Sequence, residues 1–342
     1  MHIRRDEPLQ KLNTLALQAR ASAFARVQDE AQLKRSLASA KELDLEVVVL
    51  GRGSNIILAG DLNALVIQQA SSGIEVIHDS AGAVIVRVAA GQDWHSMVEW
   101  TLEQGYFGLE NLALIPGSVG AAPIQNIGAY GVELNAFVES VHALNIDTMT
   151  PVSLNNAECN FAYRDSIFKR ELRDQLVITA VDLRLSRSPS LQLSYPALEE
   201  HFAARPDSTL SPRAVFDAIV TIRRSKLPDP ETSPNAGSFF KNPTLSYERA
   251  AYLKLQYPDL PTYRQTGEQV KLSAGWMIDR CGWKGFRERG VGVHPEHALV
   301  LVNYGNESGA RLLDLADNIR QSVAAEFGVE LEFEPRIYGA VR

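Results

Sequence analysis

The sequence predicts a protein of mixed helices and strands with two or three domains. The chain has 342 residues, which is too long for one ordinary hydrophobic core. In its first part, segments with the apolar pattern of strands alternate with segments that have the pattern of helices. The proline-rich segment 227–234 is the best domain boundary in the sequence.

Short apolar or alternating runs near the N-terminus predict strands. They comprise residues 23–27, 47–50, 64–68, 74–78 and 84–89. Asp29 can cap a helix that runs to about Leu43, with Gln32 at the capping-box position. Asp93 can cap a second helix, whose apolar residues share one face and are interpreted as core rather than as a stack for a cofactor. These residues are Trp94, Met97, Val98, Thr101 and Leu102.

Two further strands are predicted over residues 137–147 and 177–185. Ser211 and Pro212 suit the start of a helix that ends at the basic residues 223–226. Beyond the proline-rich segment we expect a helix, a strand, a long helix that Gly328 can end, and a final strand. They cover residues 273–281, 298–303, about 309–327, and 329–333.

Composition and charge favour a soluble cytoplasmic enzyme over several other classes of protein. Hydrophobic residues make up 45% of the chain and charged residues 22%, which is typical of globular proteins. The net charge of −7 argues against general binding of nucleic acids. The N-terminus lacks the apolar core of a signal peptide, and no stretch approaches the roughly 18 apolar residues of a membrane span.

The cysteines and histidines show no pattern typical of a metal site. Cys159 and Cys281 stand far apart and are interpreted as unpaired thiols, not as a disulfide or zinc ligands. His294 and His297 lack a third ligand and are interpreted as part of a polar loop. We therefore expect no metal.

The stretch 115–131 is rich in glycine, alanine and serine, and no charged residue occurs from Asn111 through Val132. Small residues allow the backbone to approach a ligand closely, and exposed amide groups can then bind an anion. The alternative interpretation is a buried, turn-rich connection between two strands. Composition alone gives the two interpretations about equal weight.

A second loop of this kind follows the predicted strand 47–50. Residues 51–55 read Gly-Arg-Gly-Ser-Asn, which suits the binding of a phosphate by backbone amides. The loop does not match the dinucleotide fingerprint, because Ile56 stands where the third glycine would fall. The chain also lacks a GxxxxGK[ST] sequence. Two such loops in one half of the chain indicate a pyrophosphate site.

Ordered blocks along nearly the whole chain resemble one family of flavoenzymes. The blocks are 51–55, 115–120, 125–131, 163–166, 223–228, 235–243, 270–279 and 331–339. They are similar to the UDP-N-acetylenolpyruvoylglucosamine reductase family, which completes the synthesis of UDP-N-acetylmuramate for bacterial peptidoglycan. The Leu-Ser-Tyr-Pro sequence at 193–196 is similar to the tyrosine loop of the longer subclass of this family.

The resemblance implies a two-lobed FAD-binding region of the vanillyl-alcohol-oxidase/PCMH type, followed by a C-terminal α+β substrate-binding domain. The expected ranges are 1–70, 71–226 and 227–342. The implied reaction is the NADPH-dependent, FAD-mediated reduction of UDP-N-acetylglucosamine enolpyruvate to UDP-N-acetylmuramate. Neither glycine-rich loop contains a histidine or cysteine that could attach the flavin, so we expect non-covalent FAD. We also expect a monomer, with no nucleic-acid or membrane partner.

The resemblance also implies three catalytic residues. Arg164 matches the arginine that stabilises the enol-like intermediate, and its planar guanidinium suits a carboxylate. Ser238 matches the proton donor, although serine is a weak acid at neutral pH. Glu334 matches the glutamate that assists protonation.

Each of these residues has an alternative interpretation. Arg164 could form a surface ion pair with Asp165, and Ser238 could serve only in a turn. Glu332 competes with Glu334, because Pro335 stands where the family commonly has valine. Proline removes a backbone donor and suits only an edge position in a sheet.

The remaining site residues are implied by their positions in the matching blocks. The expected FAD-binding residues are Gly51, Arg52, Gly53, Ser54, Asn55, Ile115, Pro116, Gly117, Ser118, Gly120, Ala121, Gln125, Asn126, Ile127, Gly128, Ala129 and Tyr130. The expected substrate-binding residues are Tyr195, Lys226, Asn242, Tyr263, Lys271, His297 and Arg336. His297 stands where some members of the family carry glutamine. For each substrate-binding residue, the alternative is a solvated surface position.

Two other functions are compatible with a flavin-binding fold. One is an oxidase that oxidises an alcohol with oxygen, and the residues Arg164, Lys226 and Ser238 argue against it. The other is a nucleotide-sugar-binding regulator without catalysis, which only the proline at 335 favours.

Overall fold

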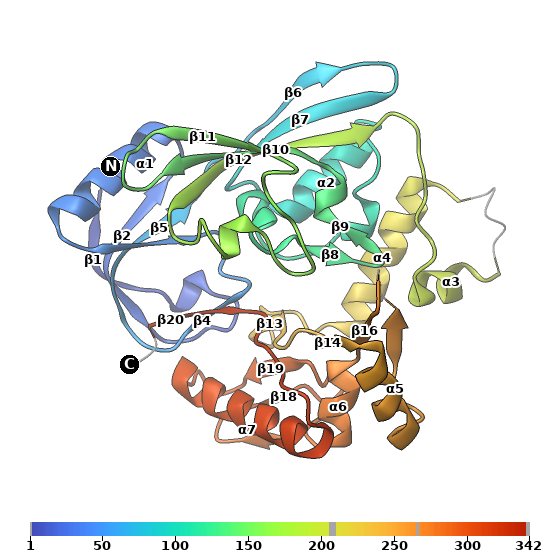
Figure 1. The fold of residues 1–342 in the computed structure, drawn as a ribbon. Helices are drawn as coiled ribbons and strands as arrows, with labels where there is room; N and C mark the ends of the chain where they lie inside the picture. The colour runs from blue at the N-terminus through green and yellow to red at the C-terminus, as the bar shows by residue number, and fades with distance from the viewer. Residues whose placement is uncertain (1, 205–209, 265–266, 340–342) are drawn as a thin grey trace. The chain divides into compact units, whose positions relative to one another are not determined.

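The computed structural model describes residues 2–204, 210–264 and 267–339. These residues form two compact units, and each unit is assembled from separate stretches of the chain. The first unit comprises the described parts of Met1–Glu7, Ala21–Arg52 and Asn63–Ser225. The second comprises those of Pro8–Arg20, Gly53–Leu62 and Lys226–Arg342. Figure 1 labels most of the helices and strands.

A four-stranded sheet and one helix form the N-terminal part of the first unit. The strand order is β1-β2-β5-β3, and β3 is parallel to β5. The strands are β1 (Arg4–Pro8), β2 (Arg20–Val27), β3 (Glu46–Leu50) and β5 (Leu62–Gln69). Helix α1 (Glu30–Glu42) buries Leu33, Leu37 and Ala40 in the core that this sheet forms.

The predicted cap of α1 is confirmed. The Asp29 carboxylate accepts a hydrogen bond from the Gln32 amide at 2.7 Å. The Gln32 side chain accepts in return from the amide of Gln28, at 3.0 Å. This reciprocal pairing satisfies backbone donors that have no partner inside the helix.

A five-stranded antiparallel sheet forms the larger part of the first unit, in the order β11-β10-β12-β7-β6. Its strands are β6 (Ile74–Asp79), β7 (Ala83–Ala89), β10 (Val138–Asn145), β11 (Pro151–Asn155) and β12 (Leu176–Ser186). Val84, Val86 and Val88 face a second core, to which α2 (Trp94–Glu103) and α4 (Pro212–Lys226) contribute. Two separate hydrophobic clusters thus lie among the described residues of the first unit.

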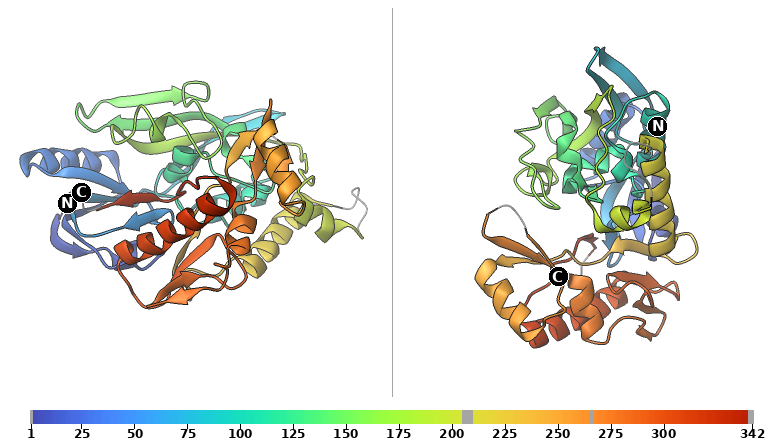
Figure 2. Two further views of the ribbon diagram at one scale, coloured as in Figure 1. Left: turned by 60° about the horizontal axis from the view of Figure 1, so that its bottom comes forward. Right: turned by 90° about the vertical axis from the view of Figure 1, so that its right-hand side faces the viewer.

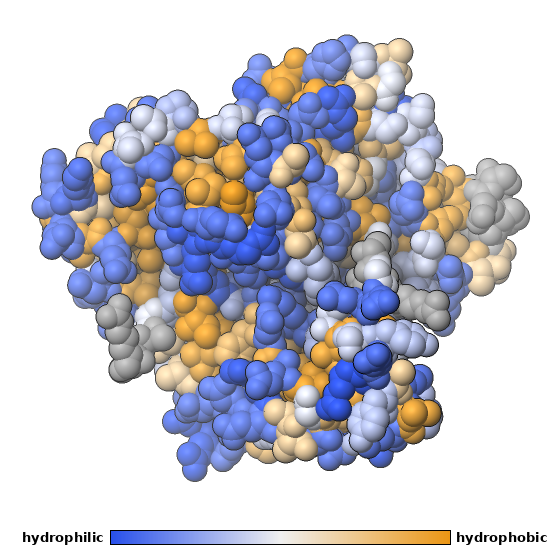
Figure 3. Space-filling model, in the orientation of Figure 1, coloured by the Kyte–Doolittle hydropathy of each residue, from blue (hydrophilic) through white to orange (hydrophobic). Residues whose placement is uncertain are grey.

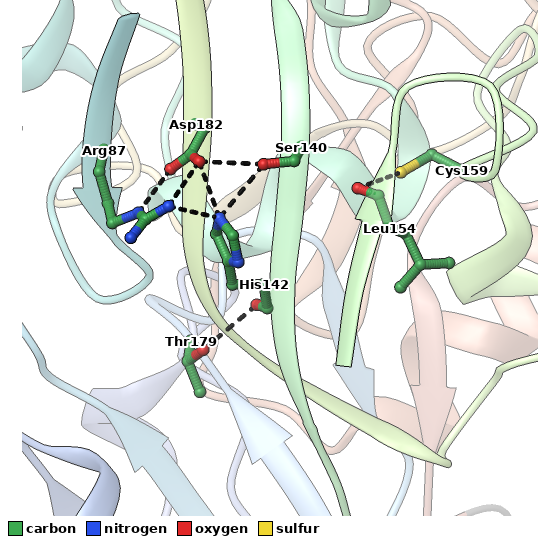
Figure 4. A network of polar contacts seen from close by, with 7 residues as sticks. All are labelled: Arg87, Ser140, His142, Leu154, Cys159, Thr179 and Asp182. Atoms are coloured by element: carbon green, nitrogen blue, oxygen red, sulfur yellow. Dashed lines mark hydrogen bonds and ion pairs between the residues drawn. The ribbon is translucent and has the colours of Figure 1, made fainter. Parts of the chain in front are cut away.

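The opposite face of the five-stranded sheet carries a polar network (Figure 4). Arg87 forms two hydrogen bonds with Asp182, each 2.8 Å long. His142 lies 2.8 Å from the same carboxylate, and the Ser140 hydroxyl donates to it at 3.0 Å. Alternation along the strands places these polar residues opposite the buried valines.

The second unit consists of small sheets and helices. One sheet has the order β13-β19-β18-β17, another has the order β14-β16-β15, and β4 pairs in parallel with β20. The strands are β4 (Ile56–Leu58), β13 (Asn235–Ser238), β14 (Thr244–Ser246), β15 (Thr262–Arg264), β16 (Gln269–Leu272), β17 (Arg287–Glu288), β18 (Val291–Val293), β19 (Val300–Asn303) and β20 (Arg336–Tyr338). The helices are α5 (Tyr247–Gln256), α6 (Ala274–Arg280) and α7 (Gly309–Phe327).

Helix α7 has the bounds that the sequence predicts, and it contacts β18 and β19 (Figures 1 and 2). Gly328 ends the helix with φ +62°, a left-handed conformation that glycine adopts without strain. Ser273, where the predicted helix 273–281 begins, caps α6 by accepting a hydrogen bond from the Trp276 amide.

The predicted strand over 329–333 is wrong. Phe333 forms only an isolated bridge with Phe240, and the strand lies later, at β20. Backbone bonds connect this segment first to residues 239–241 and then, from the Arg336 amide, to Asn55. The chain changes partner at Pro335, which has no amide hydrogen to donate.

The other predicted helices and strands are confirmed, with small shifts at their ends. Several elements had no prediction, among them β4 and α5. Short elements in the first unit, α3 (Pro196–Phe202), β8 (Gly128–Ala129) and β9 (Val132–Glu133), were also not predicted.

Hydrophobic residues on the face shown in Figure 3 are interspersed with hydrophilic ones. Among the described residues, no helix is both long and apolar enough to cross a lipid bilayer.

Candidate active site

The two glycine-rich loops meet in the first unit. A Cβ atom at Gly51 would lie 2.3 Å from the Ser118 hydroxyl oxygen, so the two loops approach each other closely there. Arg52 forms an ion pair of 3.1 Å with Asp93, the N-cap residue of α2. The start of loop 51–55 and the stretch 115–131 thus both contact the N-terminal end of α2 (Trp94–Glu103).

Hydrogen bonds connect the stretch 112–120 to the first residue of α2 and to the residues just before that helix. The carbonyl of Gly117 accepts from the Trp94 amide at 3.1 Å, and the Trp94 indole donates to the carbonyl of Leu112 at 2.8 Å. The amide of Gly120 donates to the carbonyl of Ala90 at 2.8 Å. A Cβ atom at Gly120 would lie 2.5 Å from the Ala90 Cβ. The stretch is therefore turn-rich and largely buried, as the alternative interpretation expected.

Its buried amide groups also suit an anion. Gly117 and Ser118 are both buried. In the part of the chain that the structure describes, no protein group accepts from either of their amides. Buried amide donors almost always have a partner, so this pair indicates a bound acceptor. The pyrophosphate of FAD has acceptor oxygens of the required kind.

Asn126 organises the second half of the glycine-rich stretch. It is fully buried and left-handed, with φ +45°. Its side chain donates to Glu133 at 2.9 Å and to the carbonyl of Ala162 at 3.1 Å, and it accepts from the Asn135 amide. These bonds connect the stretch to the block that contains Arg164.

Arg164 points its guanidinium at the glycine-rich stretch. Its Nη2 donates to the carbonyl of Gly128 at 2.9 Å, and its backbone is left-handed with φ +53°. Asp165 forms its ion pair with Arg170. The structure thus brings Arg164 together with predicted FAD-binding residues.

Tyr195 lies against Tyr130, with ring centroids 5.1 Å apart in an edge-on arrangement. Burial raises the pKa of the Tyr130 hydroxyl. The Asn111 side chain donates to the carbonyls of Tyr130 and Gln192, at 2.9 and 2.8 Å, and so connects the tyrosine loop to the glycine-rich stretch.

Two residues near these loops were not among the predicted site residues. Arg223 donates from Nε to the carbonyl of Leu114 at 3.1 Å, and burial lowers the pKa of its guanidinium. His95 accepts from the Leu114 amide at 3.1 Å. Arg223 lies in a block that resembles the family, whereas no sequence signal marked His95.

In the second unit, Ser238 and Glu334 lie on neighbouring segments. Ser238 ends β13, and the next carbonyl, that of Phe239, accepts from the Glu334 amide at 2.9 Å. The competitor Glu332 forms an ion pair of 2.7 Å with Lys241, and 74% of its side chain is exposed. Glu334 is therefore connected more directly to the segment of Ser238.

The predicted substrate residues of this unit lie on several elements. Lys271 and Tyr263 are directly opposite each other on β16 and β15. The Asn242 side chain accepts from the first amide of α6, at 3.0 Å. Burial lowers the pKa of His297, and the nearby charges of His294 and Lys226 lower it further.

Residues 53–55 also belong to the second unit. Gly53 has φ +64°, and a Cβ atom there would lie 2.0 Å from the carbonyl oxygen of Leu12. The carbonyl of Asn55 accepts from the amide of Arg336, a predicted substrate residue, at 3.1 Å.

The described residues contain no group of three or more metal-ligating side chains. Cys159 and Cys281 are both free thiols.

Two family models match the chain. The model described as UDP-N-acetylenolpyruvoylglucosamine reductase, C-terminal domain, matches residues 229–338, and an FAD binding domain matches residues 21–150. The reductase of that name from Pseudomonas aeruginosa is 46% identical, over 96% of this chain and 97% of that protein. The one from Chromobacterium violaceum is 45% identical, over 98% of this chain and 99% of that protein.

The chain belongs to the UDP-N-acetylenolpyruvoylglucosamine reductase family. A crystal structure of the reductase from Thermus caldophilus has the same fold, with a TM-score of 0.68 at 24% identity, over 99% of both chains. The predicted family, fold class and FAD cofactor are confirmed. The match to the FAD binding domain, residues 21–150, includes both glycine-rich loops of this reductase.

Proposed function

We propose that this chain reduces UDP-N-acetylglucosamine enolpyruvate to UDP-N-acetylmuramate, in the synthesis of peptidoglycan precursors. The observation that carries the proposal is the match to reductases of this name over nearly the full length of both chains. NADPH is the co-substrate, and the chain is an FAD-containing oxidoreductase.

The two glycine-rich loops hold FAD non-covalently. The close approach of Gly51 to Ser118 supports this role, as do the amides of Gly117 and Ser118, which find no acceptor among the described residues. The other loop residues named in the sequence analysis complete the site. The chemistry that FAD supplies when bound is hydride transfer between NADPH and the substrate.

Arg164 stabilises negative charge on the substrate carboxylate and on the carbon beside it. Its hydrogen bond to the carbonyl of Gly128 holds the guanidinium in place before the substrate arrives. Preorganised charge of this kind stabilises a transition state without further reorganisation.

Ser238 donates a proton to the substrate carbon, and Glu334 assists from the neighbouring segment. The bond between the Glu334 amide and the Phe239 carbonyl supports this pairing, because it holds the two segments in register. A serine hydroxyl needs such a neighbour to act as an acid at neutral pH.

Substrate binding uses positive and aromatic side chains from several elements. Lysines and arginine neutralise the diphosphate and carboxylate, and tyrosines can close over the nucleotide. His297 is neutral near pH 7, because its pKa lies below the ordinary value, and it can act as a hydrogen-bond donor or acceptor. The proposed residues are Tyr195, Lys226, Asn242, Tyr263, Lys271, His297 and Arg336.

The proposed active form is a monomer, as expected from the resemblance to the family. Its proposed location is the cytoplasm, with no membrane or nucleic-acid partner. The division into 1–70, 71–226 and 227–342 is also part of the proposal.

The test is the visible absorption spectrum of the purified protein, taken first as isolated and then after anaerobic NADPH. The UDP-enolpyruvyl sugar is added last. Flavin bands that bleach with NADPH and return with the sugar are the expected result. Bands that return only with oxygen would replace the proposal with an oxidase. A protein that holds no FAD after reconstitution would overturn it.

A further inference from the structure

Leu114 stands directly before the FAD-binding stretch and has a left-handed backbone, with φ +56°. This conformation is unfavourable for a residue with a Cβ atom, and most of all for one without a side-chain hydrogen bond of its own. Such a conformation persists only where the surrounding structure holds it. The two residues that follow, Ile115 and Pro116, lead into the buried amides of Gly117 and Ser118.

Side chains from two helices hold both backbone polar groups of Leu114. Its amide donates to Nδ1 of His95 on α2, at 3.1 Å. Its carbonyl accepts from Nε of Arg223 on α4, also at 3.1 Å. All three residues lie in the first unit. The amide and the carbonyl of Leu114 are therefore each held by a side chain from a different helix.

The His95 ring is itself fixed in orientation. It stacks face to face on the Phe216 ring, with centroids 5.4 Å apart and 10° between the planes. The adjacent Trp94 bonds to the carbonyls of Leu112 and Gly117, on either side of Leu114. The imidazole nitrogen is thus aimed at one amide within a rigid stretch.

This hydrogen bond exists only when Nδ1 carries no proton. A protonated ring would place an N–H group against the Leu114 N–H group, and two donors repel each other. Burial lowers the pKa of His95, which keeps the ring neutral at pH 7. Its position in the first turn of α2 acts in the same direction, because a helix N-terminus disfavours a cation.

Charged groups of both signs face the ring. Arg223 and Arg224 of α4 lower the pKa of His95, whereas Asp93 and Glu99 of α2 raise it. The two carboxylates are themselves paired, Asp93 with Arg52 at 3.1 Å and Glu99 with Arg213 at 3.8 Å. The cationic partners reduce the ability of these carboxylates to stabilise a charged imidazole.

We propose that His95 is a positioning residue for FAD: its neutral ring holds Leu114 in the left-handed conformation that presents the Gly117 and Ser118 amides to the cofactor. The role of His95 rests on the proposed function of that stretch. This role would make FAD binding depend on pH in the range near neutrality. The tyrosine and arginine of the loops cannot provide such a dependence, because their ordinary pKa values are about 10 or higher.

Two variants test this role. His95→Asn keeps an acceptor oxygen near the position of Nδ1 but does not titrate. His95→Phe keeps a ring against Phe216 and removes the acceptor. The measurement is the Kd of FAD for each apoprotein, from flavin fluorescence, between pH 5 and pH 8.

We expect the wild-type chain to lose FAD affinity as the pH falls through the pKa of His95, which burial holds below the ordinary histidine value of about 6.5. His95→Asn should bind FAD within about threefold of wild type at pH 7.5 and should lack that fall. His95→Phe should bind roughly three- to tenfold more weakly at pH 7.5, the range expected for one net hydrogen bond.

Equal affinity and an equal pH profile for wild type and His95→Phe would overturn the role of His95. The same conclusion would follow if His95→Asn kept the wild-type fall at low pH. If circular dichroism shows that His95→Phe does not fold, the comparison of wild type with His95→Asn decides alone. A wild-type chain that binds no FAD at any pH would instead contradict the proposed function.

Discussion

Arg87 on β7 and Asp182 on β12 are directly opposite each other, and both guanidinium hydrogen bonds between them are 2.8 Å long. Burial alone would raise the pKa of Asp182, but hydrogen bonds from Arg87 and His142 outweigh it and hold that pKa well below its ordinary value. Arg87 of β7, Ser140 and His142 of β10, and Asp182 of β12 converge here (Figure 4). The five-stranded sheet is thus held together on its polar face as well as in its core.

Asp182→Asn should lower the free energy of unfolding by about 2 kcal/mol at pH 7, since it removes a nearly buried carboxylate that accepts charge-assisted hydrogen bonds from the partly exposed Arg87. Chemical denaturation monitored by circular dichroism measures the change. The control is Glu139→Gln, which breaks the more exposed pair with Arg184 on the same sheet. Equal effects of the two changes would show that burial of Asp182 contributes nothing.

The lowered pKa of Asp182 also predicts a dependence on pH. The unfolded chain binds more protons than the folded chain between the ordinary pKa of aspartate, about 4, and the lower value in the folded state. The stabilisation by Asp182 is complete above about pH 4 and is lost as the pH falls further. The difference in unfolding free energy between wild type and Asp182→Asn should therefore shrink below pH 4.

Gly51→Ala should weaken FAD binding, because the added methyl group would lie 2.3 Å from the Ser118 hydroxyl oxygen and force that side chain of the proposed site to rotate. We expect the Kd of FAD to rise roughly fivefold, as a cost of about 1 kcal/mol for the displaced side chain would produce. Gly82→Ala is the matched control, because nothing lies within 4 Å of a Cβ there. Addition of Ser118→Ala removes the clashing oxygen and should recover part of the affinity; no recovery would contradict the steric explanation.

Ser238→Ala separates the two half-reactions. Reduction of the flavin by NADPH should remain nearly unchanged, whereas reoxidation by the enolpyruvyl substrate should slow by about a hundredfold or more, within the range of general acid catalysis. Stopped-flow absorbance under anaerobic conditions measures both rates. Reoxidation at the wild-type rate would remove Ser238 from the mechanism.

Glu334→Gln and Glu332→Gln distinguish the two acidic candidates. The first should slow reoxidation by the substrate by roughly ten- to a hundredfold, because a glutamine cannot share a proton with Ser238. The second should change the rate little, since an exposed ion pair such as Glu332–Lys241 contributes at most about 1 kcal/mol. The opposite ranking would transfer the catalytic role to Glu332.

Much of the local structure could be predicted because its causes are local. Asp29 and Asp93 cap helices through bonds to residues three positions away, and Gly328 ends α7 with its own backbone. The alternation of Val84, Val86 and Val88 likewise identifies the inner face of β7. By contrast, the apolar pattern of 329–333 predicted a strand where the structure forms a single bridge, since strand pairing also depends on the partner.

In the candidate site, too, some features follow from the local sequence and others depend on tertiary packing. The sequence by itself determined the family, the FAD cofactor and the loops of small residues, because these depend on residue types and their order. Only the tertiary structure decided that Gly51 meets Ser118, that Arg164 bonds to Gly128, and that His95 and Arg223 hold Leu114. Each of these contacts joins residues that are distant in the chain. Their formation depends on how separate elements pack, and no local pattern records that packing.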